Sequence, residues 1–139
     1  MSVVLILCLV LLAYVYAGYP LLCALLAGVR RRRIAASPHT PRVSVLIAAH
    51  NEIACIAQTV RNKLALDYPP ELLEIIVVSD GSTDGTDEVV AAIAAAEPRV
   101  RLLRQEPRAG KTSALNLAQA HVTGEIIVFS DANSLYAPD

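Results

Sequence analysis

Two different patterns of apolar residues divide the chain. Residues 3–29 contain no charged side chain, and a helix needs about 20 apolar residues to cross a bilayer. From residue 43 onward, short apolar runs alternate with segments whose apolar residues recur at helical spacing. The first pattern predicts a single transmembrane helix, a membrane anchor over residues 1–30. The second predicts an α/β domain over residues 43–139.

The charges around the apolar segment predict its orientation. The run Arg30–Arg33 follows the segment directly, whereas Met1, Ser2 and Val3 carry no side-chain charge. A cleaved signal peptide would show the reverse order, and positive charge holds its own flank in the cytoplasm. We therefore expect an uncleaved anchor in the cell inner membrane with the domain facing the cytoplasm. The arginines serve first as this topology signal, and they also suit anionic membrane lipids.

The second part of the chain predicts four strands, over residues 43–49, 74–79, 100–103 and 125–130. Helices are expected over residues 53–64, from a capping Thr86 to a position before Pro98, and over residues 111–122 with Gly124 ending the last. Nearly continuous apolar strands separated by helices are typical of a parallel sheet covered on both faces. A basic, proline-containing linker, residues 31–42, is expected to join this Rossmann-like α/β domain to the anchor.

The charge distribution excludes one class of partner. The first 42 residues carry five arginines and no acidic residue, whereas residues 43–139 carry seven basic and thirteen acidic residues, a net charge of −6. A nucleic-acid-binding domain would show a basic face. We therefore expect no nucleic-acid partner.

Polar residues gather where the predicted strands end. They are His50, Asn51 and Glu52 after the first strand, Asp80 after the second, Asp131 and Asn133 after the fourth, and Lys111 at the start of the last helix. Ligands of such sheets bind beyond the carboxyl ends of the strands. Carboxylate and amide oxygens suit Mg²⁺ or Mn²⁺, and a lysine at a helix start suits phosphate. The pattern predicts a phosphate-bearing ligand with a divalent cation.

Three other phosphate- or metal-binding motifs each lack required residues in this sequence. A P-loop ending in Gly110-Lys111-Thr112 needs a glycine at position 105, which is Gln105. A calcium loop starting at Asp80 needs a glutamate at its twelfth position, which is Ala91. A dinucleotide-binding fold needs glycines after the first strand, and residues 48–52 contain none.

Four segments resemble, in order, the motifs of family 2 glycosyltransferases. They read VSVLIAAHNE (residues 43–52), VVSDGSTD (residues 77–84), GK with ALN (residues 110–111 and 114–116) and FSDAN (residues 129–133). Together they span nearly all of the chain after the linker. The resemblance implies that residues 43–139 are the nucleotide-sugar-binding half of a GT-A fold, incomplete in itself.

The resemblance also implies roles for single residues. Asn51 and Glu52 would line the nucleoside pocket, with Ala48 and His50 as further donor-binding positions, His50 as wall or cap rather than catalyst. Asp80 would bond the base, expected to be uracil, and Lys111 would add charge near the nucleotide. Asp131 would begin a DxD-type motif that holds ribose and a metal on the diphosphate. Simpler alternatives stay open: Asn51 and Glu52 as a helix start, Asp80 as a turn former, and Lys111 as a solvated charge.

One position departs from the family pattern. Asn133 stands where the family usually has aspartate. An amide oxygen can bind Mg²⁺ or Mn²⁺ but brings no charge. We therefore expect Asp131 and Asn133 to hold the metal with reduced affinity, or Asp131 to act alone.

The expected activity is transfer of a sugar from a nucleotide-sugar donor, a UDP-sugar, to a glycan or lipid acceptor, with inversion. The family's general base lies well beyond the DxD-type motif, so it is expected beyond Asp139, and residues 1–139 alone should be inactive. The alternative is a membrane-tethered nucleotide-sugar-binding pseudoenzyme or remnant. A nucleotidyltransferase would instead show a Gly- and Arg-rich loop after the first strand, which residues 48–53 lack.

Overall fold

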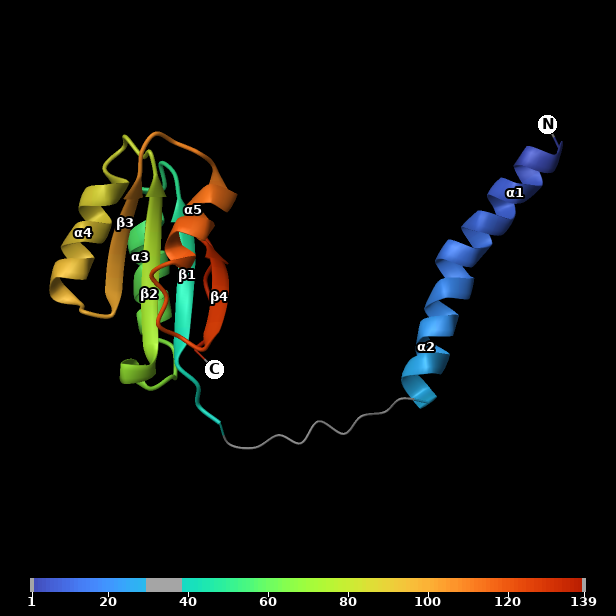
Figure 1. The fold of residues 1–139 in the computed structure, drawn as a ribbon, viewed down its shortest axis with the longest axis horizontal. Helices are drawn as coiled ribbons and strands as arrows, with labels where there is room; N and C mark the ends of the chain where they lie inside the picture. Colours follow the sequence, from blue (N-terminus) through green and yellow to red (C-terminus); the bar gives the residue numbers. More distant parts are fainter. Residues whose placement is uncertain (1, 30–38, 139) are drawn as a thin grey trace. The chain divides into compact units, whose positions relative to one another are not determined.

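The computed structural model describes residues 2–29 and 39–138, and the chain divides into two units, Met1–Pro38 and His39–Asp139. The predictions for Arg30–Arg33 and for most of the linker fall outside the described residues. The first unit contains helices α1 (Ser2–Ala13) and α2 (Tyr19–Val29), joined by the π-helical stretch η1 (Tyr14–Gly18) (Figure 1). Together they include 27 residues, Ser2–Gly28, long and apolar enough to cross a membrane.

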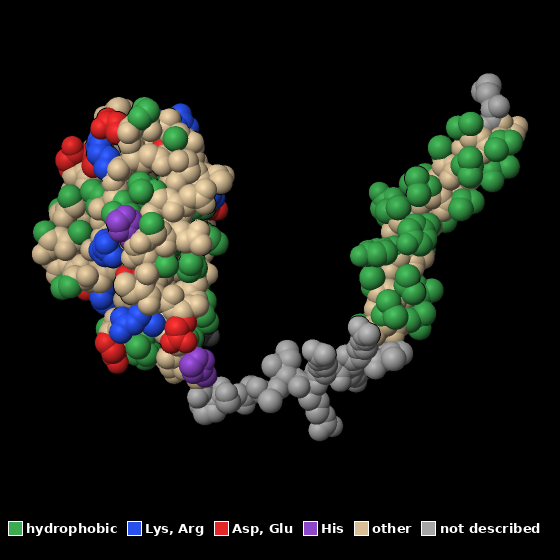
Figure 2. Space-filling model, in the orientation of Figure 1, with side chains coloured by type: hydrophobic (Ala, Val, Ile, Leu, Met, Phe, Trp, Pro, Cys, Tyr) green, Lys and Arg blue, Asp and Glu red, His purple; other side chains and the backbone are tan. Residues whose placement is uncertain are grey.

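The π-helical stretch lies just before the proline of this helix. Proline has no N–H and therefore cannot donate the regular helical bond to the carbonyl four residues earlier. Ahead of Pro20, the Tyr19 N–H donates to the carbonyl oxygen of Tyr14, five residues back. The irregularity next to Pro20 thus takes the form of a widened turn. Apolar side chains cover the described surface of this helix in Figure 2.

A four-stranded parallel sheet forms the centre of the second unit. Its strands are β1 (Val43–Ala49), β2 (Leu73–Asp80), β3 (Val100–Gln105) and β4 (Ile126–Asp131), in the order β3-β2-β1-β4. In the register, Val43 of β1 lies opposite Leu73 of β2 and Ile126 of β4. This arrangement confirms the predicted α/β class, a partial GT-A-like sheet with flanking helices preceded by an apolar helix.

Helices cover both faces of the sheet because successive strand residues point to opposite sides. Helices α3 (Ile56–Leu64) and α4 (Thr86–Ala96) pack on one face, and α5 (Lys111–Gln119) packs on the other (Figure 1). A short 3₁₀ turn, η2 (Pro70–Leu72), precedes β2. The first core includes Val45, Ile47, Ile56, Val60, Ile75, Val77 and Val90, and the second consists of Leu46, Ile76, Val78, Ala114 and Ala118.

Several predicted boundaries were wrong. Helix α3 begins at Ile56 rather than at residue 53, because residues 53–55 form a turn. Thr86 is the first residue of α4 rather than its cap: Gly85 precedes it in a left-handed conformation, and the Asp84 carboxylate accepts the Thr86 N–H at 3.0 Å. Side-chain capping therefore comes from Asp84, two residues earlier in the chain.

The end of α5 also differs from the prediction. The helix stops at Gln119, before the predicted Val122, and Gly124 is not its terminator. Instead, Gly124 passes so close to β1 that an added Cβ would lie 2.6 Å from the backbone nitrogen of Ser44. Gly124 is therefore needed for close approach of two backbones rather than for ending a helix.

Candidate functional site

A cleft of about 450 Å³ opens at the carboxyl edge of the sheet. The ends of β1, β2 and β4 contribute to it, together with the segment that leads into α5. Its lining residues are Ala48, Ala49, His50, Glu52, Asp80, Arg108, Lys111, Asp131, Ala132 and Asn133. Every donor-binding and metal-binding residue expected from the sequence lines this cleft, with Asn51 as the exception.

Asp80 is the most enclosed charged residue of the cleft, because only 3% of it is exposed. Its carboxylate accepts the backbone N–H groups of Ala109 and Gly110, both at 2.8 Å, and Gln105 Nε2 at 2.6 Å. Burial would raise the pKa of this carboxylate, but these bonds and the nearby Arg108 guanidinium hold the pKa below its ordinary value. Three donors leave about one acceptor position for a ligand.

Gly81 allows the loop before α5 to sit against the end of β2. It adopts a φ of +66°, and an added Cβ would lie 3.0 Å from the Cβ of Arg108. A side chain at position 81 would thus be strained in conformation and would displace Arg108. Sequence reasoning did not assign Arg108 to the site, although its place just before Gly110 and Lys111 was a usable signal.

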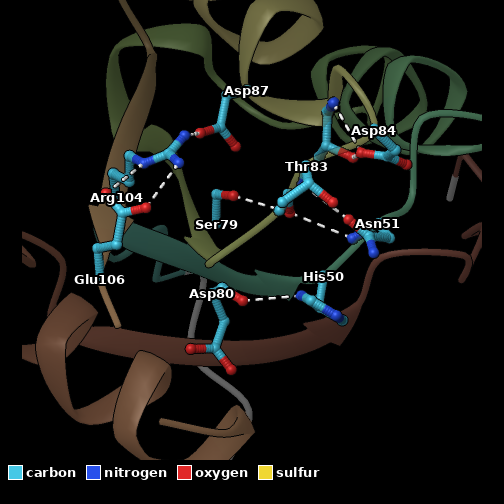
Figure 3. A network of polar contacts seen from close by, with 11 residues as sticks. His50, Asn51, Ser79, Asp80, Thr83, Asp84, Asp87, Arg104 and Glu106 are labelled. Atoms are coloured by element: carbon cyan, nitrogen blue, oxygen red, sulfur yellow. Dashed lines mark hydrogen bonds and ion pairs between the residues drawn. The ribbon is translucent and has the colours of Figure 1, made fainter. Parts of the chain in front are cut away.

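His50 forms one wall of the cleft. Its Nδ1 lies 2.8 Å from the carbonyl oxygen of Asp80, as Figure 3 shows. A carbonyl oxygen only accepts hydrogen bonds, so Nδ1 carries a proton and donates it in this contact. The contact also ties the loop after β1 to the end of β2.

Asn51 joins two loops rather than lining the cleft. It has a left-handed φ of 55°, its N–H donates to Ser82 Oγ at 3.1 Å, and its Oδ1 accepts the Thr83 N–H at 2.9 Å (Figure 3). Asn51 is not among the residues that line the cleft, and its backbone N–H and side-chain oxygen bond the neighbouring loop. A polar residue that tolerates positive φ serves here because it can bond the neighbouring loop.

Glu52 lies between the cleft and α4. Its N–H donates to Thr86 Oγ1 at 2.9 Å, while its carboxylate accepts Cys55 Sγ at 3.1 Å. Burial raises the pKa of the Cys55 thiol, and the hydrogen bond and charge of Glu52 raise it further. Cys55 is therefore held as a neutral donor, which fixes the Glu52 side chain at the cleft.

Lys111 and Asp131 face each other across the cleft. The Nζ of Lys111, the first residue of α5, bonds Oδ1 of Asp131, the last residue of β4. Both side chains remain more than half exposed. The pair lies at the N-terminus of α5. The free N–H groups at that end of the helix favour the binding of an anion.

The donor set fits a metal that is shared with a ligand. Asp131 and Asn133 are separated by one residue and both line the cleft. Among the described residues, no group of three or more His, Cys, Asp or Glu side chains forms a metal cage. Mg²⁺ and similar ions are commonly held by one or two carboxylates plus phosphate oxygens. Two protein oxygens beside the N-terminus of a helix match that pattern.

The comparison with known families agrees with this arrangement. The family model described as "Glycosyl transferase family 2" matches residues 44–139. The matched region contains both loops of the cleft, the start of α5 and the Asp131–Asn133 segment. The chain belongs to glycosyl transferase family 2 and forms an N-terminal part of the family domain.

Individual relatives are glycosyltransferases. The beta-monoglucosyldiacylglycerol synthase of Nostoc sp. (strain PCC 7120) is 39% identical over 101 residues, which are 71% of this chain and 22% of the synthase. The solved mannosyltransferase PcManGT from Pyrobaculum calidifontis, in complex with GDP-Man and Mn²⁺, is 35% identical with a TM-score of 0.75 and covers 94% of this chain. The match covers 40% of that mannosyltransferase.

A more distant solved structure shares the fold. S. aureus TarS 1-349 in complex with UDP has a TM-score of 0.65 at 22% identity and covers 70% of this chain and 29% of its own. The two solved neighbours therefore carry different nucleotides, GDP-Man and UDP. The chain spans 22% of the synthase, 40% of the mannosyltransferase and 29% of TarS 1-349.

Proposed function

We propose that the cleft binds the nucleotide-diphosphate part of a sugar donor for transfer to an acceptor hydroxyl. One observation carries the proposal: the N-terminus of α5 with Lys111 lies opposite Asp131 and Asn133 in a single cleft. This places anion-binding and cation-binding groups within reach of one diphosphate. The likeness to a mannosyltransferase holding GDP-Man and Mn²⁺ supports it.

The diphosphate would lie between the two sides of the cleft. Lys111, Arg108 and the free N–H groups of α5 would bind its oxygens, and Asp131 with Asn133 would hold Mg²⁺ or Mn²⁺ against it. When bound, the metal would neutralise charge that develops on the leaving nucleoside diphosphate. Lys111 would then exchange its bond to Asp131 for a bond to phosphate, which keeps both charges compensated.

The nucleoside would occupy the part of the cleft near β1 and β2. Ala48, His50 and Glu52 would form its walls, and Asp80 would accept an N–H of the base with its remaining lone pair. A uracil N–H fits a single free acceptor of this kind, so we propose a UDP-sugar as the donor. Asn51 would contribute by positioning the loop through Ser82 and Thr83 rather than by contact.

Transfer would join the acceptor oxygen to the anomeric carbon as the bond to the diphosphate breaks, with inversion of configuration. The hydroxyl proton would pass to a carboxylate base supplied by a part of the protein outside residues 1–139. A donor site within these residues and a base elsewhere in the protein would agree with the limited share of each relative that this chain covers. The acceptor would be a glycan or a lipid, and the lipid alternative is supported by the diacylglycerol named in one relative.

The apolar helix Ser2–Gly28 would hold the enzyme at the membrane. We propose that it spans the inner membrane and that the catalytic domain, with residues 43–139 as its donor half, faces the cytoplasm, where nucleotide sugars are made. Five arginines between residues 30 and 42, and no acidic residue among the first 42, support this orientation.

A transfer assay tests the proposal. Membranes containing the intact protein would be incubated with Mn²⁺ and radiolabelled UDP-sugars or GDP-sugars, and labelled lipid and glycan would be measured. We expect label from a UDP-sugar to enter acceptor, and Asp131→Ala to reduce the rate at least a hundredfold. Donor binding without any transfer would instead identify a nucleotide-sugar-binding pseudoenzyme.

A further inference from the structure

The segment after β4 is held through every second carbonyl by α3 and by the turn that follows α3. Residues 132–138 run from the end of β4 back toward the opposite edge of the sheet, where the C-terminus lies in Figure 1. The bonds are Thr59 Oγ1 to Ala132 O (2.6 Å), Lys63 Nζ to Ser134 O, Asn62 Nδ2 to Tyr136 O (2.9 Å) and Asp67 N–H to Pro138 O (2.9 Å). The acceptors recur at every second residue, although the first of them lies in a turn that the Ser134 N–H closes on the Asp131 carbonyl oxygen (3.3 Å).

Lys63 is the unusual member of this series. It is fully buried, and its Nζ has two oxygen acceptors, Ser134 O and Asn62 Oδ1 at 3.3 Å, with the Tyr136 ring centroid 3.6 Å away. No carboxylate in the described part of the chain forms an ion pair with it. Burial lowers the pKa of its ammonium group.

Burying an ammonium group without an anionic partner costs desolvation free energy. A methionine of similar length would occupy the same volume without the desolvation cost. Packing alone therefore does not explain a lysine at position 63, whereas the position of the carbonyl groups that it and Thr59 bind does. Ser134 and Ala132, the carbonyls held by Lys63 and Thr59, stand on either side of Asn133.

This bracing matters at Asn133 because the sheet does not extend to it. Asp131 is the last residue of β4, paired with Ala48 of β1, and the chain then leaves the sheet in a turn. Asn133 and Ala132 both line the cleft, but Ala132 is buried and belongs to the core that α3 covers, whereas Asn133 is exposed. The bonds from α3 thus fix the backbone on both sides of Asn133, and with it the direction of the Asn133 side chain.

We propose that Lys63 and Thr59 are positioning residues for the metal, which fix the backbone around Asn133 so that its amide oxygen joins Asp131 at the donor diphosphate. This inference rests on the proposed donor-binding function. Asn133 is an uncharged ligand, so its contribution depends on being held in place before the metal arrives. Residues that orient metal ligands typically change metal affinity by about 10–100-fold.

The test is nucleotide binding to the intact protein in detergent, measured by calorimetry with UDP in Mn²⁺ and again in EDTA. Lys63→Met is expected to weaken binding about tenfold in Mn²⁺ and to leave binding in EDTA unchanged. Thr59→Val is expected to do the same, whereas Thr59→Ser keeps the hydroxyl and should restore the unsubstituted value. Arg61→Met, on the exposed side of the same helix, controls for the loss of a positive charge.

The outcomes separate the two proposals. Absence of UDP and GDP binding to the unsubstituted protein would overturn the proposed function and this inference with it. Manganese-dependent binding that persists unchanged in Lys63→Met and Thr59→Val would overturn the inference alone, as would an equal loss in Mn²⁺ and in EDTA. If Lys63→Met does not fold, the Thr59→Val and Thr59→Ser pair decides the same question.

Discussion

Lys111 at the start of α5 bonds Asp131 at the end of β4, so the cleft compensates its own charges when no ligand is present. Both groups have a second use in the proposed complex, Lys111 toward phosphate and Asp131 toward the metal. Donor binding therefore exchanges this ion pair for two others. An exposed ion pair contributes little to stability, so breaking it on donor binding would cost little free energy.

Loss of Lys111 should affect the diphosphate and not the nucleoside. We expect Lys111→Met to weaken UDP binding about tenfold, because a hydrogen bond from a charged group is worth about 1.5–3 kcal/mol. Uridine binding should stay unchanged. Equal losses for UDP and uridine would show that Lys111 supports the pocket rather than the phosphate.

Restoring a carboxylate at position 133 should strengthen metal-dependent binding. Asn133→Asp adds a negative charge beside Asp131 without a large change in size. We expect UDP affinity in Mn²⁺ to rise about fivefold, since charged oxygen ligands bind divalent ions more tightly than amides do. In EDTA the same substitution should weaken binding through repulsion of the diphosphate. Unchanged affinity under both conditions would remove Asn133 from the metal site.

Asp80 should contribute to stability as well as to binding. In Asp80→Asn the amide group cannot accept from all three donors, and leaving a buried donor unpaired costs about 1–3 kcal/mol. We expect the free energy of unfolding in detergent to fall by that amount at pH 7. The isosteric change keeps the size of the side chain, so packing is not altered.

The pH dependence of the same variant gives a second check. The folded state lowers the pKa of Asp80, so its stabilisation is fully present above the unfolded pKa of about 3.9 and is lost as the pH falls through the lower, folded value. Asp80→Asn should therefore lose less stability on acidification than the unsubstituted protein does. Parallel pH profiles for the two proteins would contradict the assignment.

Gly124 should tolerate no side chain. A Cβ at this position would meet Ser44 N and Ser44 Oγ, both at 2.6 Å, and backbone atoms cannot move aside cheaply. We expect Gly124→Ala to destabilise the domain by about 1–3 kcal/mol, measured by thermal unfolding. Gly28→Ala, where an added Cβ meets nothing within 4 Å, is the matched control.

The strands were the most predictable part of the fold. Residues 43–49 form β1 with the predicted limits, because a short, mostly apolar run that is rich in β-branched residues and bounded by polar residues is typical of a buried strand. Helix ends were less predictable, because they depend on contacts from elsewhere: Asp84 serves α4, and Ser44 determines the need for Gly124. Such contacts join residues up to 80 positions apart.

Contacts between residues that are distant in the sequence also limited the prediction of the site. Asp80 and Asp131 were predicted to lie at the edge of the sheet, and in the structure each is the last residue of a strand and lines the cleft. The bond from the Thr83 N–H to Asn51 was not predicted, since it depends on how two loops meet. The burial of Lys63 was not predicted, because a lysine in a helix gives no sign of burial until the segment of Ser134 packs against it.

Calorimetric titration of the intact protein with UDP, in Mn²⁺ and in EDTA, tests the central claim most directly. The account predicts binding that is tighter in Mn²⁺ and that Asp131→Asn weakens about tenfold in Mn²⁺ but not in EDTA. Failure of UDP and of GDP to bind under either condition, in protein shown to be folded, would contradict a donor site in this cleft.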